Sequence, residues 1–119
     1  MPDIKSIADL VGEELNGVCF VMDYVEFHFN GPVLRALSDP RISTASGVAK
    51  FPESGSRDEL CKLIGLTVTR VEVREEDAIR LEFSDGASLT VPLDQEHRAG
   101  PEAAHFISGS GHGLGMSIW

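Results

Sequence analysis

The fold of this chain is decided by the stretch Asp77-Ala78-Ile79-Arg80-Leu81-Glu82-Phe83-Ser84-Asp85-Gly86. Its apolar residues fall on every second position with charged residues between them, which is typical of a strand that buries one face. The Asp-Gly pair is a favoured turn, and the alternation resumes after it at Leu89, Val91 and Leu93. The stretch therefore predicts an antiparallel hairpin with one apolar side.

A second stretch, Asp23-Tyr24-Val25-Glu26-Phe27-His28-Phe29-Asn30-Gly31, repeats this pattern, and Val33 to Leu37 continue it after the turn. The two hairpins resemble copies of one unit, each entered through a Leu-x-Gly segment, Leu15-Asn16-Gly17 and Leu63-Ile64-Gly65. This alignment predicts that Phe29 and Phe83 occupy equivalent core positions. The alternative, two unrelated amphipathic hairpins with common turn residues, stays open.

The remaining segments predict short elements around these hairpins. Apolar spacing predicts a short helix within Ile4 to Leu15, and Ser56 with Glu59 forms a capping-box pattern before a helix that stops at Gly65. Residues 38–56 are expected to be irregular, with one short strand around Gly47 to Phe51. Further strands are expected over residues 66–73, 104–107 and 114–119. We predict one α+β domain spanning residues 1–119: a mostly antiparallel, strongly curved sheet or partly closed barrel built from two similar hairpin units, with one or two short helices.

Composition restricts the function more than it defines it. With 42% hydrophobic and 24% charged residues, the chain has ordinary globular usage. Its net charge of -9 disfavours nucleic acid and anionic membranes as partners, because both require a basic footprint. The sequence contains no secretory pattern at its start and no bilayer-length apolar run, so a cytoplasmic location is expected. There Cys19 and Cys61 would stay reduced, and we expect both as small buried hydrophobes.

No segment carries a recognisable catalytic or cofactor motif. The glycine-rich run Gly109 to Gly115 lacks the following helix and lysine of a phosphate loop and is better explained as a hairpin turn. The four histidines and two cysteines match no zinc spacing, and no serine lies on a strand-to-helix elbow. The sequence therefore predicts no catalytic residue, no cofactor and no metal, and it gives no support for an enzyme.

One acidic cluster suggests a direction for function. Glu72, Glu75, Glu76 and Asp77 fall in one strand-turn region and are partly offset by nearby arginines. They would suit a protein-binding patch that attracts a basic partner, and a solvated turn is the alternative.

The chain resembles a family of small bacterial domains of unknown function. The resemblance rests on turns and core positions: Leu15-Asn16-Gly17, Leu60 to Gly65, Phe83-Ser84-Asp85-Gly86, Gly111 to Gly115 and the terminal Ile118-Trp119. Some similar proteins look like immunity proteins of toxin-based conflict systems. The resemblance thus implies a non-catalytic protein-binding module, immunity-protein-like, with a basic protein as partner. The alternative is a small-ligand-binding domain with a pocket between the sheet and the Ser56–Gly65 helix, and homo-oligomer formation is left open.

Overall fold

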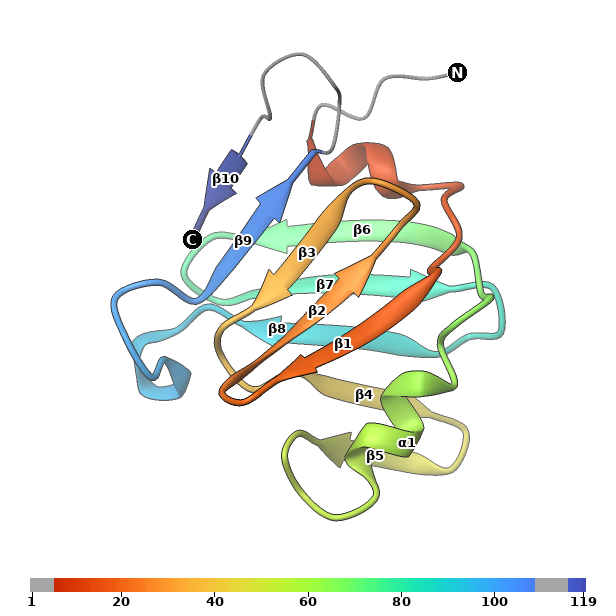
Figure 1. Cartoon of the computed structure of the whole chain (residues 1–119), viewed down its shortest axis with the longest axis horizontal. Helices are drawn as coiled ribbons and strands as arrows, with labels where there is room; N and C mark the ends of the chain where they lie inside the picture. The colour runs from red at the N-terminus through yellow and green to blue at the C-terminus, as the bar shows by residue number, and fades with distance from the viewer. Residues whose placement is uncertain (1–5, 109–115) are drawn as a thin grey trace.

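The computed structural model describes residues 6–108 and 116–119 and contains two five-stranded antiparallel sheets (Figure 1). The first sheet has the strand order β1-β2-β3-β9-β10, and the second has the order β5-β4-β8-β7-β6. The strands are β1 Gly17–Val21, β2 Tyr24–His28, β3 Val33–Ala36, β4 Arg41–Thr44, β5 Gly47–Lys50, β6 Val68–Arg74, β7 Ala78–Phe83, β8 Ser88–Pro92, β9 Ala104–Ile107 and β10 Met116–Ile118. Three short helices accompany them: η1 Ile7–Leu10, α1 Ser56–Cys61 and η2 Gln95–His97.

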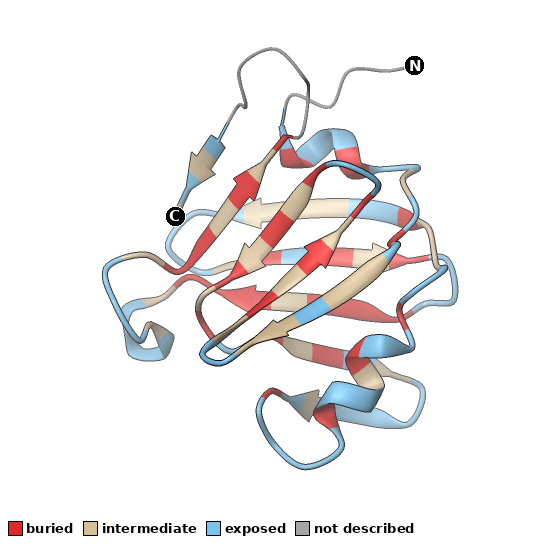
Figure 2. Ribbon diagram, in the orientation of Figure 1, coloured by how far each residue is buried: buried red, intermediate tan, exposed pale blue. Residues whose placement is uncertain are grey.

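The two sheets stack face to face, and the strands of one run across those of the other (Figure 1). The alternation predicted for both hairpins is confirmed, because their apolar positions form the inner faces of the two layers. Figure 2 shows this alternation as red bands along the strands. The core between the layers contains Val25, Phe27, Phe29, Leu34 and Phe106 from the first sheet and Ile79, Leu81, Phe83, Leu89 and Val91 from the second.

Within the described ranges the two sheets are not closed into a barrel, so the partly closed barrel that the sequence offered beside a strongly curved sheet is not confirmed. The chain leaves the first sheet after β3, adds β4 and β5 to the second sheet, and returns after β8 to add β9 and β10 to the first. The isolated bridge between Glu14 and Thr67 and the backbone hydrogen bonds around it link the layers at one corner. A mostly antiparallel fold with little helix is confirmed.

The backbone hydrogen bonds around this corner bridge form two equivalent pairs. Leu15 N donates to Leu66 O and Val68 N donates to Glu13 O, both at 2.9 Å. Gly12 N donates to Val68 O and Gly65 N to Leu15 O, both at 2.8 Å. Each bond maps onto its counterpart when the two segments are exchanged, so a local two-fold relates the β1-β2-β3 unit to the β6-β7-β8 unit.

This symmetry corrects the predicted alignment of the repeat. Gly12 and Gly65 are equivalent, with positive φ angles of 93° and 92° that favour glycine. The matching entry segments are therefore Leu10-Val11-Gly12 and Leu63-Ile64-Gly65, whereas Leu15-Asn16-Gly17 leads into β1. Phe29 and Phe83 remain equivalent and are both buried, as predicted.

The predicted helices are shorter in the structure. In the described part of the Ile4 to Leu15 segment, only η1 is helical, because Gly12 takes its positive φ and the backbone then pairs with residues 65–68. The capping box at Ser56 is wrong: Gly55 is the N-cap and Ser56 is the first helical residue.

Several predicted strands also change. The segment before β5 is not irregular, since it contains β4, and the region from Gly17 divides into β1 and β2 at a turn around Met22. The predicted strands near residues 47–51 and 104–107 correspond to β5 and β9. Of the predicted last strand, Leu114 and the glycine-rich run before it lie outside the described residues, and Met116–Ile118 form β10.

Both cysteines are free and exposed, so their predicted burial is wrong. Cys19 lies on the outer side of β1 opposite Glu26, because the odd-numbered positions of this strand point away from the core. No helix in the described residues is long and apolar enough to span a membrane.

Candidate functional site

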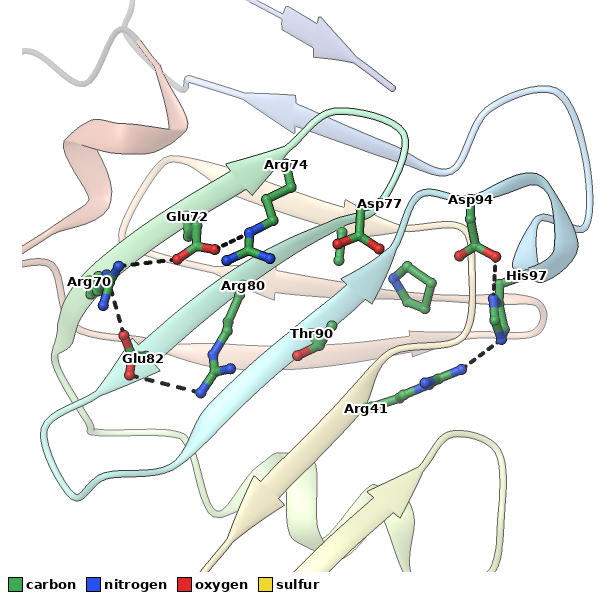
Figure 3. Close-up of a pocket in the computed structure, with 12 residues that line it drawn as sticks. Arg41, Arg70, Glu72, Arg74, Asp77, Arg80, Glu82, Thr90, Asp94 and His97 are labelled. Atoms are coloured by element: carbon green, nitrogen blue, oxygen red, sulfur yellow. Dashed lines mark hydrogen bonds and ion pairs between the residues drawn. The ribbon is translucent and has the colours of Figure 1, made fainter.

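The strongest candidate site is the outer side of β6, β7, β8 and β4, which we call the charged face. A hollow of about 540 Å³ opens on it. Figure 3 shows charged side chains from β4, β6 and β7 around this hollow, with Thr90 of β8 between them. The lining residues are Arg41, Arg70, Glu72, Arg74, Asp77, Ala78, Arg80, Glu82, Thr90, Pro92, Asp94 and His97.

Strand register explains why the face is hollow. Arg41, Thr90, Arg80 and Glu72 are direct neighbours in one row across β4, β8, β7 and β6. Thr90 has a short side chain between two long arginines, and the adjacent pair Ala78 and Pro92 is also short. The floor therefore consists of small residues, and the walls consist of arginines and carboxylates.

Two glutamates on this face already form ion pairs with arginines. Glu72 is paired on both sides, at 3.2 Å from Arg70 Nη2 and 2.5 Å from Arg74 Nε. Glu82 lies 3.6 Å from Arg70 Nε and 3.9 Å from Arg80 Nη2. These ion pairs hold Arg70 and Arg74 along β6, whereas Arg80 has only the longest of the four contacts.

A second chain of contacts joins the β8–β9 connection to β4. The turn of η2 places His97 beside Asp94, and His97 Nδ1 lies 2.6 Å from Asp94 Oδ2. Arg41 Nη2 donates to His97 Nε2 at 2.7 Å. A guanidinium can only donate, so His97 Nε2 must accept, and the imidazole is neutral with its proton on Nδ1. The hydrogen bond from His97 lowers the pKa of Asp94, and the charge of Arg41 adds a smaller effect.

This arrangement leaves two guanidiniums available at the hollow. Across residues 6–108 and 116–119, no carboxylate lies within ion-pair distance of Arg41, whose partner is a neutral imidazole. Arg80 has one carboxylate oxygen at 3.9 Å and a side chain that is 53% exposed. Both arginines flank Thr90, about 10 Å apart across two interstrand spacings.

The equivalent row on the first sheet is occupied differently. There His105, Arg35 and Glu26 take the places of Arg41, Thr90 and Arg80. Arg35 stands at the centre, donates from Nε to Glu26 Oε2 at 2.9 Å, and lies within 3.2 Å of His105 Nδ1. A long side chain with its own carboxylate partner thus fills the position that Thr90 leaves open on the charged face.

The predicted acidic cluster is only partly brought together. Glu72 is half-buried and paired with arginines, so it belongs to the ion-pair network. Asp77 is exposed at the rim of the hollow, and Glu75 and Glu76 are exposed in the β6–β7 turn. In the described structure none of these last three side chains has an ion pair. A binding role for the cluster stays a prediction.

From the sequence, the arginines near the acidic cluster indicate only an offset of its charge, and no pattern points to Arg41 or His97 as site residues. Arg70, Arg74 and Arg80 alternate along their strands, which indicates a shared outer face. Arg41 joins them only because β4 pairs with β8, a long-range contact that no local pattern reveals.

Two further places were considered. A recess of about 190 Å³ lies between α1 and the end of β4, lined in part by Thr44, Glu59 and Lys62. This is where the alternative prediction placed a ligand pocket, but the volume is below the usual range of small-molecule sites. No group of three or more His, Cys, Asp or Glu side chains that could hold a metal is present in the part of the chain that the structure describes.

Comparison with known proteins adds no relative: no protein-family model, no curated protein and no solved structure matches the chain.

Proposed function

We propose that this chain is a non-catalytic protein-binding module that uses the charged face. The observation that carries the proposal is the composition of that face: its four cationic side chains are all arginine, interleaved with four carboxylates and without lysine. Arginine is enriched and lysine depleted at protein interfaces, because the planar guanidinium pairs bidentately and is weakly hydrated. The chain's own ion pairs hold two of these side chains in fixed positions, which lowers the entropy lost on docking.

The charge of the chain supports a basic partner. Glu75, Glu76 and Asp77 form an exposed acidic end of the charged face, and the whole chain carries a net charge of -9. Such a field accelerates the encounter with a cationic surface and weakens with added salt. The proposal includes a cytoplasmic location and, by the resemblance to immunity-like proteins, a toxin as the partner class.

The contacts of His97 support the non-catalytic part of the proposal. Among the described residues that line the hollow, His97 is the only imidazole. Its Nε2 accepts from Arg41 and its Nδ1 donates to Asp94, so neither nitrogen is available to take a proton from a substrate.

The experiment compares two doubly substituted chains. Glu75→Lys with Glu76→Lys reverses the acidic turn, and Glu53→Lys with Asp23→Lys makes the same charge change at exposed positions elsewhere. Proteins captured from the source cells by the wild type and the control, but lost with the turn variant, are candidate partners. For a purified candidate, the association rate should fall roughly tenfold in the turn variant and with rising salt. Equal rates for the two variants would contradict the role of the turn.

The hollow itself favours a second candidate function, the binding of a small ligand. Its volume of about 540 Å³ falls in the range of small-molecule sites, which the recess beside α1 does not reach.

A further inference from the structure

We infer that the hollow of the charged face binds a small oxyanion, a phosphate or a carboxylate, between Arg41 and Arg80 and above Thr90. This inference is independent of any protein partner. It concerns a ligand group that would contact these two arginines, neither of which has a carboxylate of the chain close to it.

The first step is the pairing of charges at the hollow, which four arginines and four carboxylates line. Glu72 and Glu82 are shared by Arg70, Arg74 and Arg80, so two carboxylates serve three guanidiniums. The contact to Arg80 is the longest of these, at 3.9 Å. An oxyanion would give Arg80 the close bidentate partner that the chain does not supply.

The second step concerns Arg41. Asp94 is the carboxylate closest to it in the network, but Asp94 is held by His97, and Arg41 donates to the neutral imidazole. The positive charge of Arg41 is therefore oriented by a hydrogen bond and not neutralised by it. His97 acts as a positioning residue, since it directs the guanidinium without itself carrying charge.

The third step is shape. Arg41 and Arg80 stand on either side of Thr90 in one row, and Thr90 adds a hydroxyl donor at the floor (Figure 3). Two interstrand spacings separate the arginines by about 10 Å, a span that their extended side chains can close around one anionic group. The opposing charges are four carboxylates: Glu72 at the end of the row, Glu82 beside Arg80, Asp94 beside His97, and Asp77 at the rim. Glu72 is already neutralised by two arginines, and Asp77 borders the open side.

The fourth step is the equivalent row of the first sheet. There the central position holds Arg35 and a flanking position holds Glu26, so the carboxylate next to the arginine belongs to the chain. On the charged face the central position is Thr90, and a carboxylate at this place has to come from outside. The two rows thus have the same strand arrangement and differ in the source of the anion. In the first sheet the chain itself provides the carboxylate, and on the charged face a ligand would provide it.

The test is a titration of the ¹⁵N-labelled chain with sodium phosphate and, separately, sodium acetate, against sodium chloride at equal ionic strength. We expect saturable shifts of the Thr90 amide and of the Arg41 and Arg80 Nε–H signals with at least one oxyanion. Arg41→Gln and Arg80→Gln should each weaken this binding by about tenfold or more. Arg57→Gln, which removes the same charge on α1, should change it by less than about twofold.

A further variant distinguishes loss of binding from loss of folding. Thr90→Glu keeps both arginines and places the chain's own carboxylate between them, so the folded variant should no longer show saturable shifts. The inference is overturned if the shifts of the wild type are linear in both oxyanions, if Arg57→Gln weakens binding as much as Arg41→Gln, or if Thr90→Glu binds like the wild type.

Discussion

His97 shows how one hydrogen bond can fix the protonation of a whole group of residues. Because Arg41 donates to Nε2, this nitrogen acts as the acceptor, and the ring proton lies on Nδ1. The remaining ring proton is then directed at Asp94 and favours its charged form. The orientation of Arg41 at the hollow therefore depends on a carboxylate that Arg41 does not itself contact.

Replacing His97 by Phe should raise the pKa of Asp94 toward its ordinary value, because the hydrogen bond from His97 is the main cause of the lowered pKa. In the wild type, the lowered value means that this contact stabilises the fold above the ordinary pKa of Asp. That contribution is lost as the pH falls through the folded-state value. Carbon-detected NMR of the Asp94 carboxyl group measures both titrations. His28→Phe, on the other sheet, is the control and should leave Asp94 unchanged.

Phe29 and Phe83 allow a paired test of the core. Both rings are buried at the ends of equivalent strands, so Phe29→Ala and Phe83→Ala should each lower the free energy of unfolding by about 3 to 5 kcal/mol. Urea denaturation followed by circular dichroism measures the loss. Met22→Ala, at a side chain that is 92% exposed, should change it by less than about 0.5 kcal/mol. Losses below about 1 kcal/mol for both phenylalanines would contradict their placement.

Among the elements, β10 is the shortest strand and still belongs to the core of the fold. Met116 and Ile118 point outward, and Trp119 directly after the strand packs against the core. Trp119 N donates to Ala104 O at 2.9 Å, just as Phe51 N after β5 donates to Pro40 O at 3.0 Å. The ring of Trp119 is therefore partly covered by the chain's own core.

Deleting Met116 to Trp119 should leave β9 unpaired on one side and give insoluble or loosely packed protein. Trp119→Ala should cost roughly 2 to 3 kcal/mol, less than a fully buried ring, because Trp119 is half-buried. The chain has one tryptophan, so its fluorescence reports on this site alone, and its emission should shift to the red on unfolding. A soluble deletion variant with an unchanged melting curve would contradict the role of β10.

Elements with a regular pattern and a strong turn could be predicted from the sequence, and the others could not. Hairpins β2–β3 and β7–β8 combine alternation with Asn30-Gly31 and Asp85-Gly86. By contrast, β4 is four residues long and buries only Ile42, so it has too few positions to show a period. The turn between β1 and β2 falls in a continuous apolar run, where no alternation marks the boundary.

The candidate site was even less accessible to prediction. A cluster of acidic residues can be recognised in the sequence alone, and it predicted a site at Glu72 and its neighbours. The hollow depends instead on the short side chain of Thr90 beside Arg41. These two residues become neighbours only through the long-range pairing of β4 with β8. Side-chain size at one position across a sheet is a property of the assembled layers and not of a local pattern.

At the scale of the whole molecule, the two units are interlaced. The first unit supplies β1, β2 and β3 to one sheet and β4 and β5 to the other, and the second unit does the converse. Two of the three described helices also contact the edge strand of the opposite unit, η1 against β6 and α1 against β1. Neither half contains a complete layer, so the core forms only when both are present.

Cutting the chain between Ser54 and Gly55 should therefore give two fragments that do not fold alone and recombine when mixed. Fragment 55–119 carries Trp119, which needs β3 of the other fragment beside β9, so its emission should move to the blue only after mixing. Equilibrium titration of one fragment into the other measures this change. A cooperative melting transition for either fragment by itself would contradict the interlaced arrangement.

The pairing of β3 with β9 also has a consequence for biosynthesis. Ala36 and Ala104 are neighbours in the sheet but lie 68 positions apart in the chain, so the ribosome releases them at different times. At typical elongation rates, the interval is roughly 3 to 14 s. During this time one edge of β3 has no strand to pair with, although its other edge can pair with β2. Slower translation would lengthen this interval, and a chaperone that binds nascent chains would have its main opportunity before residue 104 emerges.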